Sequence, residues 1–291
     1  MPIHVNNEGV WTLVNEVHVN DAGVWREPQE VYVNDAGTWR TVHKVVIVAA
    51  NVNNLSLYSL AGSPTTAITL KVTVNAGVTV TSTSTANAAI DISSFATGSY
   101  IQLINFGTIF GAGGAGGFGA ATGVTEEAGN TDGPGFGGDN PVNPAGGGGG
   151  GGNGNNGSAG GSAIRINTNS TLRIQNHGTI VGGGGGAGGD GGNNSGGGSG
   201  GNGGNALQQS DLFANSSTTL DNRSGATFAG GGGGGSGWGN RSAGSTEGGA
   251  PGQAGFITSN GGGNFGAQGS AGRVSTNNAT TIYTGAGVHT L

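Results

Sequence analysis

The chain has 291 residues, among them 69 glycines and no cysteine, and only 8% of its residues are charged. The missing cysteine excludes disulfides and thiolate metal sites, while a net charge of −6 argues against binding to nucleic acid or to anionic membranes. Because the chain shows neither a basic, apolar leader nor an apolar run long enough to cross a bilayer, we expect a soluble protein made in a cytoplasm.

A regular repeat occupies residues 3–47. Its three copies begin at Ile3, Val17 and Val31 and read IHVNNEGVW, VHVNDAGVW and VYVNDAGTW. Asparagine and aspartate favour the start of a tight turn and glycine suits its left-handed position, so each copy predicts two strands joined by a turn. Apolar residues of one parity would then share a face, which predicts a four-stranded antiparallel meander in a first domain, residues 1–48.

The apolar face of this meander needs a partner, because so small a sheet is not stable by itself. Each repeat places one tryptophan on that face: Trp11, Trp25 and Trp39. The partner is either the rest of this chain or another protein, and the sequence leaves both possibilities open.

The next segment, residues 49–106, predicts a short all-β connector. Its runs of threonine and valine, at residues 68–75 and 78–82, are bounded by turn residues such as Ala76-Gly77. We expect these strands to lead directly into the first glycine unit.

Glycine dominates the third segment, residues 107–291, which holds all but six of the glycines. A disordered linker is the simplest interpretation of such a composition. Against it, three glycine runs follow similar lead-ins: IQLINFGTIF from Ile101, LRIQNHGTIV from Leu172 and LDNRSGATFA from Leu220. A repeated strand–turn–strand unit before each run is typical of a stacked repeat, so we predict an ordered structure.

The glycine runs have neither the strict period nor the proline content of collagen. They fit an extended helix of three residues per turn, whose backbone N–H and C=O groups point sideways and bond to neighbouring helices. Only glycine allows backbones to approach so closely. We therefore predict an all-β protein that ends in a bundle of polyglycine II helices, with a hydrogen-bonded core instead of an apolar interior.

Diverse insertions interrupt the glycine: residues 122–145, 153–158, 190–205, 236–253 and 258–270. Loops on a rigid scaffold are where recognition residues concentrate. Catalysis finds little support, because no nucleophile is paired with a base. Solvated surface charge explains Glu126, Glu127 and Asp132 better than a catalytic carboxylate pair does, and the histidines lack the spacing of metal ligands. We expect neither an enzyme nor a cofactor.

Several of these motifs resemble those of bacteriophage tail proteins. The NDAGVW and NDAGTW units resemble repeats found in such proteins. The N-x-G-T-I units with trailing glycines, within residues 101–291, resemble glycine-rich tail-fibre and receptor-binding proteins, above all the tip adhesins of T-even-type phages. In that group a bundle of polyglycine helices displays variable loops that bind an outer-membrane receptor, and an amino-terminal region fastens the adhesin to the fibre. The repeats of residues 3–47 do not resemble that attachment region.

The resemblance implies a virion tail component that binds the host surface without covalent chemistry. Its partners would be other tail or fibre proteins, attached through Trp11, Trp25 and Trp39, and an outer-membrane protein or surface glycan. The candidate receptor-binding residues are Phe118, Glu126, Glu127, Asp132, Phe136, Asp139, Trp238, Arg241 and Glu247. A purely structural virion protein and an ice-binding protein are the alternatives, and the sequence leaves monomer and homo-oligomer open.

Overall fold

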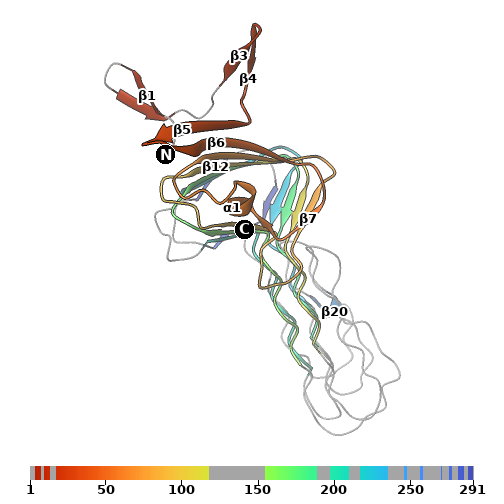
Figure 1. The fold of residues 1–291 in the computed structure, drawn as a ribbon. Coiled ribbons are helices and arrows are strands. Elements are labelled where there is room, and N and C mark those ends of the chain that lie inside the picture. Colours follow the sequence, from red (N-terminus) through yellow and green to blue (C-terminus); the bar gives the residue numbers. More distant parts are fainter. Residues whose placement is uncertain are drawn as a thin grey trace.

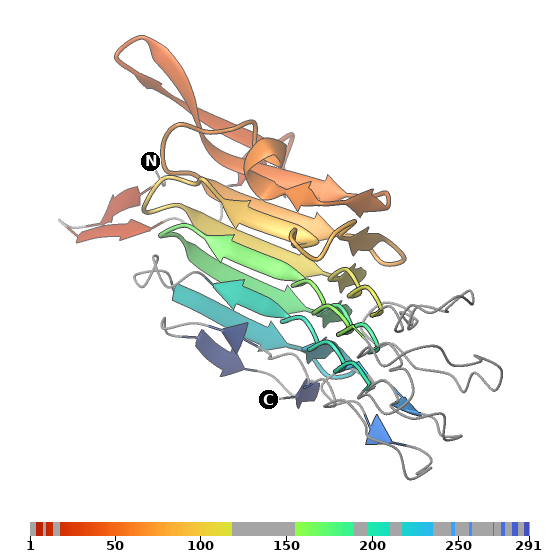
Figure 2. The same ribbon diagram turned by 90° about the horizontal axis from the view of Figure 1, so that it is seen from below.

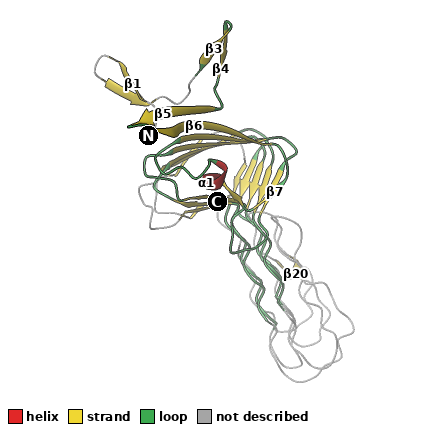
Figure 3. Cartoon of the chain, in the orientation of Figure 1, coloured by secondary structure: helices red, strands yellow, loops and turns green. Residues whose placement is uncertain are grey.

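The structure is a computed structural model that describes residues 4–7, 10–13, 18–117, 155–188, 197–209 and 217–234, together with residue 270 and five short strands near the carboxyl terminus. This part of the chain is almost entirely strand and loop, as Figure 3 shows by colour, and its one helix is α1 (Leu57–Leu60). The expected all-β class is confirmed. In the described residues no helix has the length and apolar character needed to cross a membrane.

Three sheets form the body of the molecule, and the chain visits them in a fixed order, so that each turn adds one strand to each sheet (Figure 2). The seven-stranded sheet contains β5 (Glu30–Asp35), β6 (Thr38–Val48), β9 (Thr69–Val74), β12 (Tyr100–Asn105), β15 (Thr171–Asn176), β18 (Ser217–Asn222) and β23 (Thr281–Thr284). The five-stranded sheet contains β8 (Leu55–Ser56), β11 (Ile90–Ser93), β14 (Ile164–Asn167), β17 (Leu207–Gln209) and β22 (Ser275–Thr276). The six-stranded sheet contains β7 (Val52–Asn53), β10 (Thr79–Thr81), β13 (Thr108–Phe110), β16 (Thr179–Val181), β19 (Thr227–Ala229) and β24 (Val288–Thr290). Successive turns pair in parallel, which makes the body a three-sided parallel β-helix.

Alternation of buried and partly exposed residues builds the interior of this β-helix. In β12 the odd-numbered Ile101 and Leu103 point inward, and Leu103 aligns with Val72 on one side and Ile174 on the other. All four of these side chains are fully buried. Burying each one is worth about 1.5–3 kcal/mol, so these columns of side chains are a main source of stability.

This apolar interior corrects the expectation of a purely hydrogen-bonded core in the carboxyl-terminal half. Ile164, Ile174, Leu220 and Phe228 all follow residue 107, and each is at most 1% exposed. Composition misleads here because one turn of the β-helix contributes only a few inward residues. Register then stacks these residues with those of the neighbouring turns into a continuous core.

The N-x-G-T-I units form the corner between the seven-stranded and six-stranded sheets. Their asparagines are buried and stacked: Asn105 Nδ2 donates to Asn176 Oδ1 (2.9 Å), and Asn176 Nδ2 donates to Asn222 Oδ1 (2.8 Å). A Cβ atom at Gly178 would lie 2.1 Å from the carbonyl oxygen of Gly107, so this tight corner requires glycine. The strand–turn–strand unit expected from the sequence is present, and it repeats along the β-helix.

Glycine segments extend from the β-helix and run side by side (Figures 1 and 2). The outgoing segments, residues 111–117, 182–188 and 230–234, leave the six-stranded sheet after β13, β16 and β19. The returning segments, residues 155–161 and 197–205, lead into the five-stranded sheet at β14 and β17. We call these five segments together the glycine lattice.

Hydrogen bonds in the glycine lattice recur at every third residue. The N–H groups of residues 111, 114 and 117 donate to the carbonyls of residues 181, 184 and 187 at 2.8–3.0 Å. The N–H groups of residues 157, 160 and 163 likewise donate to the carbonyls of residues 199, 202 and 205 at 2.8–2.9 Å. Outgoing segments are therefore parallel to one another, as are returning segments, and the two layers run in opposite directions.

Bonds across the two layers make residues 182–188 the centre of the lattice. Gly186 N donates to Ser158 O of one returning segment (2.9 Å), and Gly186 O accepts from Gly201 N of the other (2.7 Å). Every residue of 182–188 is buried. A Cβ atom at Gly186 would lie 2.0 Å from Ala115 O, so the backbones approach at a distance that only glycine permits.

The amino-terminal repeats form three hairpins and not one meander. The strands are β1 (His4–Asn7) with β2 (Val10–Leu13), β3 (Val19–Asp21) with β4 (Val24–Arg26), and β5 with β6. Each of the first two pairs is a separate sheet, and the third is part of the seven-stranded sheet. Glu27, Pro28 and Gln29 separate the second hairpin from the third, and Pro28 has no N–H to donate to a ladder.

The three segments expected from the sequence share sheets. β6 continues from the third hairpin into the β-helix, where it pairs in parallel with β9. Strands on both sides of residue 106 also pair directly, as β12 does with β15. The glycine lattice and the β-helix are therefore successive parts of the same turns of the chain.

Candidate functional site

Two ends of the molecule are candidates for binding: the outer end of the glycine lattice and the amino-terminal hairpins. Figure 1 shows them on opposite sides of the β-helix. Eight of the nine residues predicted to bind a receptor lie outside the described residues: Phe118, Glu126, Glu127, Asp132, Phe136, Asp139, Trp238 and Arg241. The ninth, Glu247, belongs to the short strand β20 (Thr246–Glu247) and is opposite Phe256 of β21 (Phe256–Ile257).

The outer end of the lattice is held by backbone hydrogen bonds up to the last described glycines. Gly117 N donates to Ala187 O at 2.8 Å, and Gly234 N donates to Gly201 O at the same distance. Residues 118–154 link one outgoing segment to its returning partner, and residues 189–196 link the next pair. The predicted insertions 122–145 and 236–253 therefore begin close to where the described lattice ends. The predicted insertions 153–158 and 190–205 need correction, because residues 155–158 and 197–205 belong to the returning segments of the lattice.

The second and third hairpins share one turn geometry. Asn20 Oδ1 accepts a hydrogen bond from Gly23 N, and Asn34 Oδ1 accepts one from Gly37 N, both at 2.8 Å. These two glycines have φ angles of +86° and +88°, a conformation that favours glycine. The NDAG motif thus makes the turn that the sequence predicts.

An ion pair bridges the strands of both hairpins. Arg26 lies 3.6 Å from Asp21, and Arg40 lies 3.1 Å from Asp35. All four side chains are at the surface, where such pairs contribute at most about 1 kcal/mol. These two ion pairs therefore contribute little to the stability of the hairpins.

Large apolar side chains of these hairpins face solvent. Trp25 is 67% exposed and Trp39 is 68% exposed, and Val24, Tyr32 and Val33 are exposed as well. The side chain of Trp11 lies outside the described part of the chain. Of the two partners left open for the tryptophans, the rest of this chain does not cover Trp25 and Trp39 in the described residues.

The register pairs Trp25 with Asn20, so Trp25 lies on the face opposite to Val24. It pairs Trp39 with Asn34, so Trp39 lies on the face opposite to Val33. The prediction that apolar residues of one parity share a face is therefore wrong in these two hairpins.

A buried polar cluster lies where the hairpins meet the β-helix. His43 Nε2 is 3.7 Å from Glu27 Oε1, and Lys71 Nζ is 2.7 Å from Glu27 Oε2. Burial lowers the pKa of His43 below its ordinary value of 6.5, and the nearby Glu27 carboxylate opposes this shift without cancelling it. The sequence analysis missed this cluster, because its members come from three segments that become neighbours only in the fold.

A surface carboxylate links the two strands of the third hairpin, β5 and β6. Glu30 accepts a hydrogen bond from the Tyr32 hydroxyl and lies 2.9 Å from Lys44 Nζ. These two contacts hold the pKa of Glu30 below its ordinary value, with the larger effect coming from Tyr32 and the smaller from Lys44. The contacts fix the base of the hairpin against the first strand of the β-helix.

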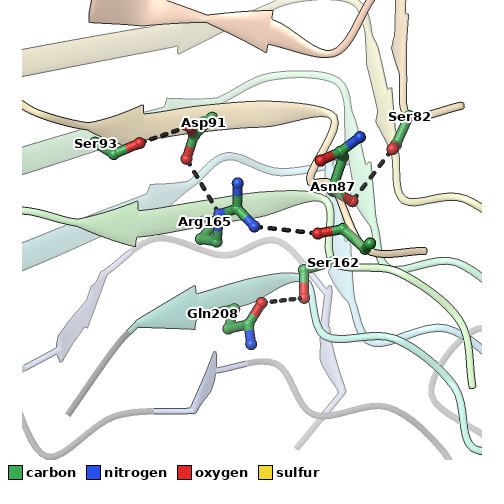
Figure 4. Close-up of polar contacts among 8 residues, drawn as sticks. Ser82, Asn87, Asp91, Ser93, Ser162, Arg165 and Gln208 are labelled. Atoms are coloured by element: carbon green, nitrogen blue, oxygen red, sulfur yellow. Dashed lines mark hydrogen bonds and ion pairs between the residues drawn. The ribbon is translucent and has the colours of Figure 1, made fainter. Parts of the chain in front are cut away.

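The outer face of the five-stranded sheet carries a polar network that is satisfied internally (Figure 4). Arg165 Nε donates to Asp91 Oδ1 (3.2 Å), and Arg165 Nη1 donates to Ala86 O (3.1 Å). Ser93 donates to the second oxygen of the same aspartate at 2.5 Å. The ion pair of Arg165 with Asp91 connects β14 to β11 and stabilises the stacking of these two strands.

In the described part of the chain, no group of three metal-ligating side chains gathers in one place. A recess beside β11 and β14 is lined by Phe95 and by serine, threonine and asparagine side chains, without an acid or base.

Comparison with known proteins gives one family and one solved structure. The family model of the phage tail fibre adhesin Gp38 matches residues 43–289. The structure is similar to the crystal structure of the gp37-gp38 adhesin tip complex of the bacteriophage S16 long tail fibre, with 17% identity, a TM-score of 0.35, and coverage of 86% of this chain and 82% of that chain. No curated protein matches the chain.

Proposed function

Because the chain belongs to the phage tail fibre adhesin Gp38 family and is thus a receptor-binding protein of the phage tail, we propose that it attaches the virion to its host through loops displayed at the outer end of the glycine lattice. The target is an outer-membrane protein or a surface glycan. Binding is non-covalent, with no catalytic step and no cofactor. The protein is made in the cytoplasm of the bacterial host before it joins the virion.

We propose further that the lattice is a bundle of polyglycine II helices. The support is the period of its hydrogen bonds, in which every third N–H of one segment donates to every third C=O of a neighbour. A helix of three residues per turn presents its backbone groups to a given neighbour at this spacing, whereas a β-strand does so at every second residue. An experimental structure with φ of about −75° and ψ of about +145° along residues 182–188 would support this assignment, and β-strand angles there would refute it.

The lattice gives the loops their rigid bases. A loop whose two ends are fixed loses less conformational entropy on contact with a receptor than a free segment would. Among the predicted contact residues, Phe118, Phe136 and Trp238 would act as anchors, each worth about 2 kcal/mol when central in an interface. The charged contact residues would be Glu126, Glu127, Asp132, Asp139, Arg241 and Glu247.

The opposite end of the molecule would join the virion. We propose that Trp11, Trp25 and Trp39 attach the protein to other tail or fibre proteins. The exposure of Trp25 and Trp39, at 67% and 68%, supports this role, because it leaves both side chains accessible and tryptophan is enriched in protein–protein interfaces. Residues 1–48 would then be the attachment domain, residues 49–106 a connector, and residues 107–291 the recognition domain.

The test is binding of fluorescently labelled full-length protein to a panel of bacterial strains. A second form has residues 122–145 and 236–253 replaced by short glycine–asparagine linkers, and Trp25→Ala is the matched control at the other end. We expect strain-selective binding that the control retains and the loop replacement loses, while circular dichroism stays unchanged. Binding to no strain, together with association with purified tail proteins, would instead identify a purely structural virion protein.

A further inference from the structure

We propose that the recess beside β11 and β14 binds a neutral saccharide, at a site separate from the loops of the glycine lattice. This inference goes beyond the proposed function, which places recognition at the outer end of the lattice. It follows from the fixed walls of the recess, from the polar groups in its lining that have no partner, and from the absence of charge in that lining.

The recess lies at the corner where the chain passes from the five-stranded to the seven-stranded sheet. Its lining comes from residues 93–97, at and after the end of β11, and from residues 167–169, at and after the end of β14. Parallel pairing of β11 with β14 brings these two corners of successive turns together. A recess of this kind depends on register, so no short window of sequence could have indicated it.

Hydrogen bonds between the two corners fix the walls of the recess. Thr168 Oγ1 donates to Phe95 O at 2.7 Å, and Gly98 N donates to Asn169 O at 3.4 Å. The ring of Phe95 is also held by an edge-on contact with Tyr58, with 5.5 Å between the ring centroids. A ligand would therefore meet walls that are already in place, which lowers the entropy lost on binding.

Several polar groups of the lining have no partner in the described residues. The side chains of Ser94, Thr97 and Asn167 make no hydrogen bond there. Asn169 Oδ1 is buried and receives no donor. The polar groups that a ligand can reach are therefore those of the exposed Ser94, Thr97 and Asn167.

The size and composition of the recess suit one sugar unit. Its volume is about 330 Å³, and one aromatic ring lies among hydroxyl and amide groups. Ligand sites of this size commonly combine an apolar surface with a few polar groups that fix orientation. A sugar ring offers both an apolar C–H face and hydroxyls that donate and accept hydrogen bonds, as the serine, threonine and asparagine groups do.

Charge excludes ionic ligands from this site. The lining has no charged side chain. Asp91 of the adjoining strand β11 is paired with Arg165, and Ser93 donates to its second oxygen (Figure 4). A charged ligand would lose much more hydration energy in the recess than a neutral one, without gaining a counter-charge.

Titration with simple sugars tests the proposal. The full-length protein is titrated with the methyl glycosides of glucose, galactose and N-acetylglucosamine, followed by saturation-transfer and chemical-shift NMR. Glucuronate is the charged probe and glycerol the small polyol. We expect at least one glycoside to bind, and glucuronate and glycerol to bind at least about tenfold more weakly. Binding of no glycoside, or equal binding of glucuronate or glycerol, would overturn the proposal.

Substitutions in the lining locate the bound sugar. Asn167→Ala and Ser94→Gly each remove one unpaired polar group and should weaken glycoside binding about fivefold. Ser94 has a φ angle of +68°, which glycine adopts easily, so that change should not impair folding. The matched control is Asn75→Ala, an exposed asparagine just after β9 and outside the recess. Unchanged affinity in both lining variants, or an equal loss in the control, would refute the site.

The loop-replaced form separates this inference from the proposed function. With residues 122–145 and 236–253 replaced, the protein should keep its affinity for the glycoside even where it no longer binds cells. Loss of glycoside binding in that form, with unchanged circular dichroism, would place the sugar on the loops and overturn the recess site. Glycoside binding in a protein that binds no strain would refute the proposed function and leave this site standing.

Discussion

The β-helix and the glycine lattice solve the problem of buried backbone in opposite ways. In the β-helix, backbone bonds connect strands while inward side chains such as Leu103 and Ile174 fill the interior. In the lattice, residues 182–188 are buried with almost no side chains, and neighbouring backbones fill the space themselves. The comparison teaches that one chain can alternate between a core of side chains and a core of peptide groups within each turn.

The two regions therefore respond to substitution with opposite signs. In the β-helix, the damaging change is the removal of carbon from an interior that is filled by side chains. In the lattice, the damaging change is the addition of carbon where backbones are in contact. Four sets of substitutions test this contrast and the parts of the fold next to it, each measured as the free energy of unfolding in urea.

The largest effect is expected from Leu103→Ala in the β-helix. Leu103 is fully buried between Val72 and Ile174, so its truncation leaves a cavity and should cost about 4 kcal/mol. The control is Gln102→Ala on the same strand, whose side chain points outward, and we expect it to cost less than about 1 kcal/mol. Equal losses in the two variants would show that β12 does not have this inward face.

A single methyl group should break the lattice. In Gly186→Ala the new Cβ would lie 2.0 Å from Ala115 O, so two segments must separate, at a cost of about 3 kcal/mol. The adjacent Ala187→Gly removes a methyl group instead and should cost about 1 kcal/mol or less. If adding and removing the methyl group cost the same, the close approach of the segments is refuted.

A substitution in the column of stacked asparagines, Asn105, Asn176 and Asn222, tests the corner between the seven-stranded and six-stranded sheets. Asn176→Ala leaves Thr227 O and Asn105 Nδ2 without the partners that bond to them at 2.8 and 2.9 Å, and it should cost about 2 kcal/mol. The neighbouring Gln175→Ala, which removes one surface bond to Gln102, should cost about 0.5 kcal/mol. A smaller loss for Asn176→Ala than for Gln175→Ala would contradict a structural role for the column.

The smallest effect concerns the cluster of His43, Glu27 and Lys71 at the edge of the β-helix, where the hairpins join it. Because the pKa of His43 is below 6.5 in the folded protein, its contribution is complete above pH 6.5 and is lost as the pH falls, when the unfolded chain binds a proton that the folded chain resists. Between pH 7.5 and 5, the wild type should therefore lose more stability than His43→Gln, in which Glu27 and Lys71 are unchanged. The urea midpoint of each protein is measured at both pH values. An equal loss of stability in the two proteins would refute the lowered pKa of His43.

The sequence predicted those features that are encoded locally. The NDAG turns depend on four adjacent residues, and the N-x-G-T-I corner depends on five, so both were recognisable. Pairing between distant residues was not, since Asn105 and Asn176 are 71 positions apart and meet only through the register of β12 and β15. For the same reason the stacked apolar interior went unnoticed, because no short window contains two members of one column.

The amino-terminal repeats show the limit of local pattern most clearly. The pattern correctly placed two strands and a turn in each copy. Whether successive hairpins pair with each other depends on their connectors, and Pro28 interrupts the ladder between the second and the third. Of the candidate receptor contacts, only Glu247 falls in a described strand, so those residues remain predictions.

The two-layer order of the glycine lattice also has an evolutionary consequence. Each outgoing segment and its returning partner are fixed by bonds to their neighbours, as residues 111–117 and 155–161 are. A change in the length or content of residues 118–154 would leave all of those bonds in place, because the connecting chain starts and finishes at anchored ends. The lattice thus allows one insertion to be replaced by recombination without disturbing the fold of the other segments.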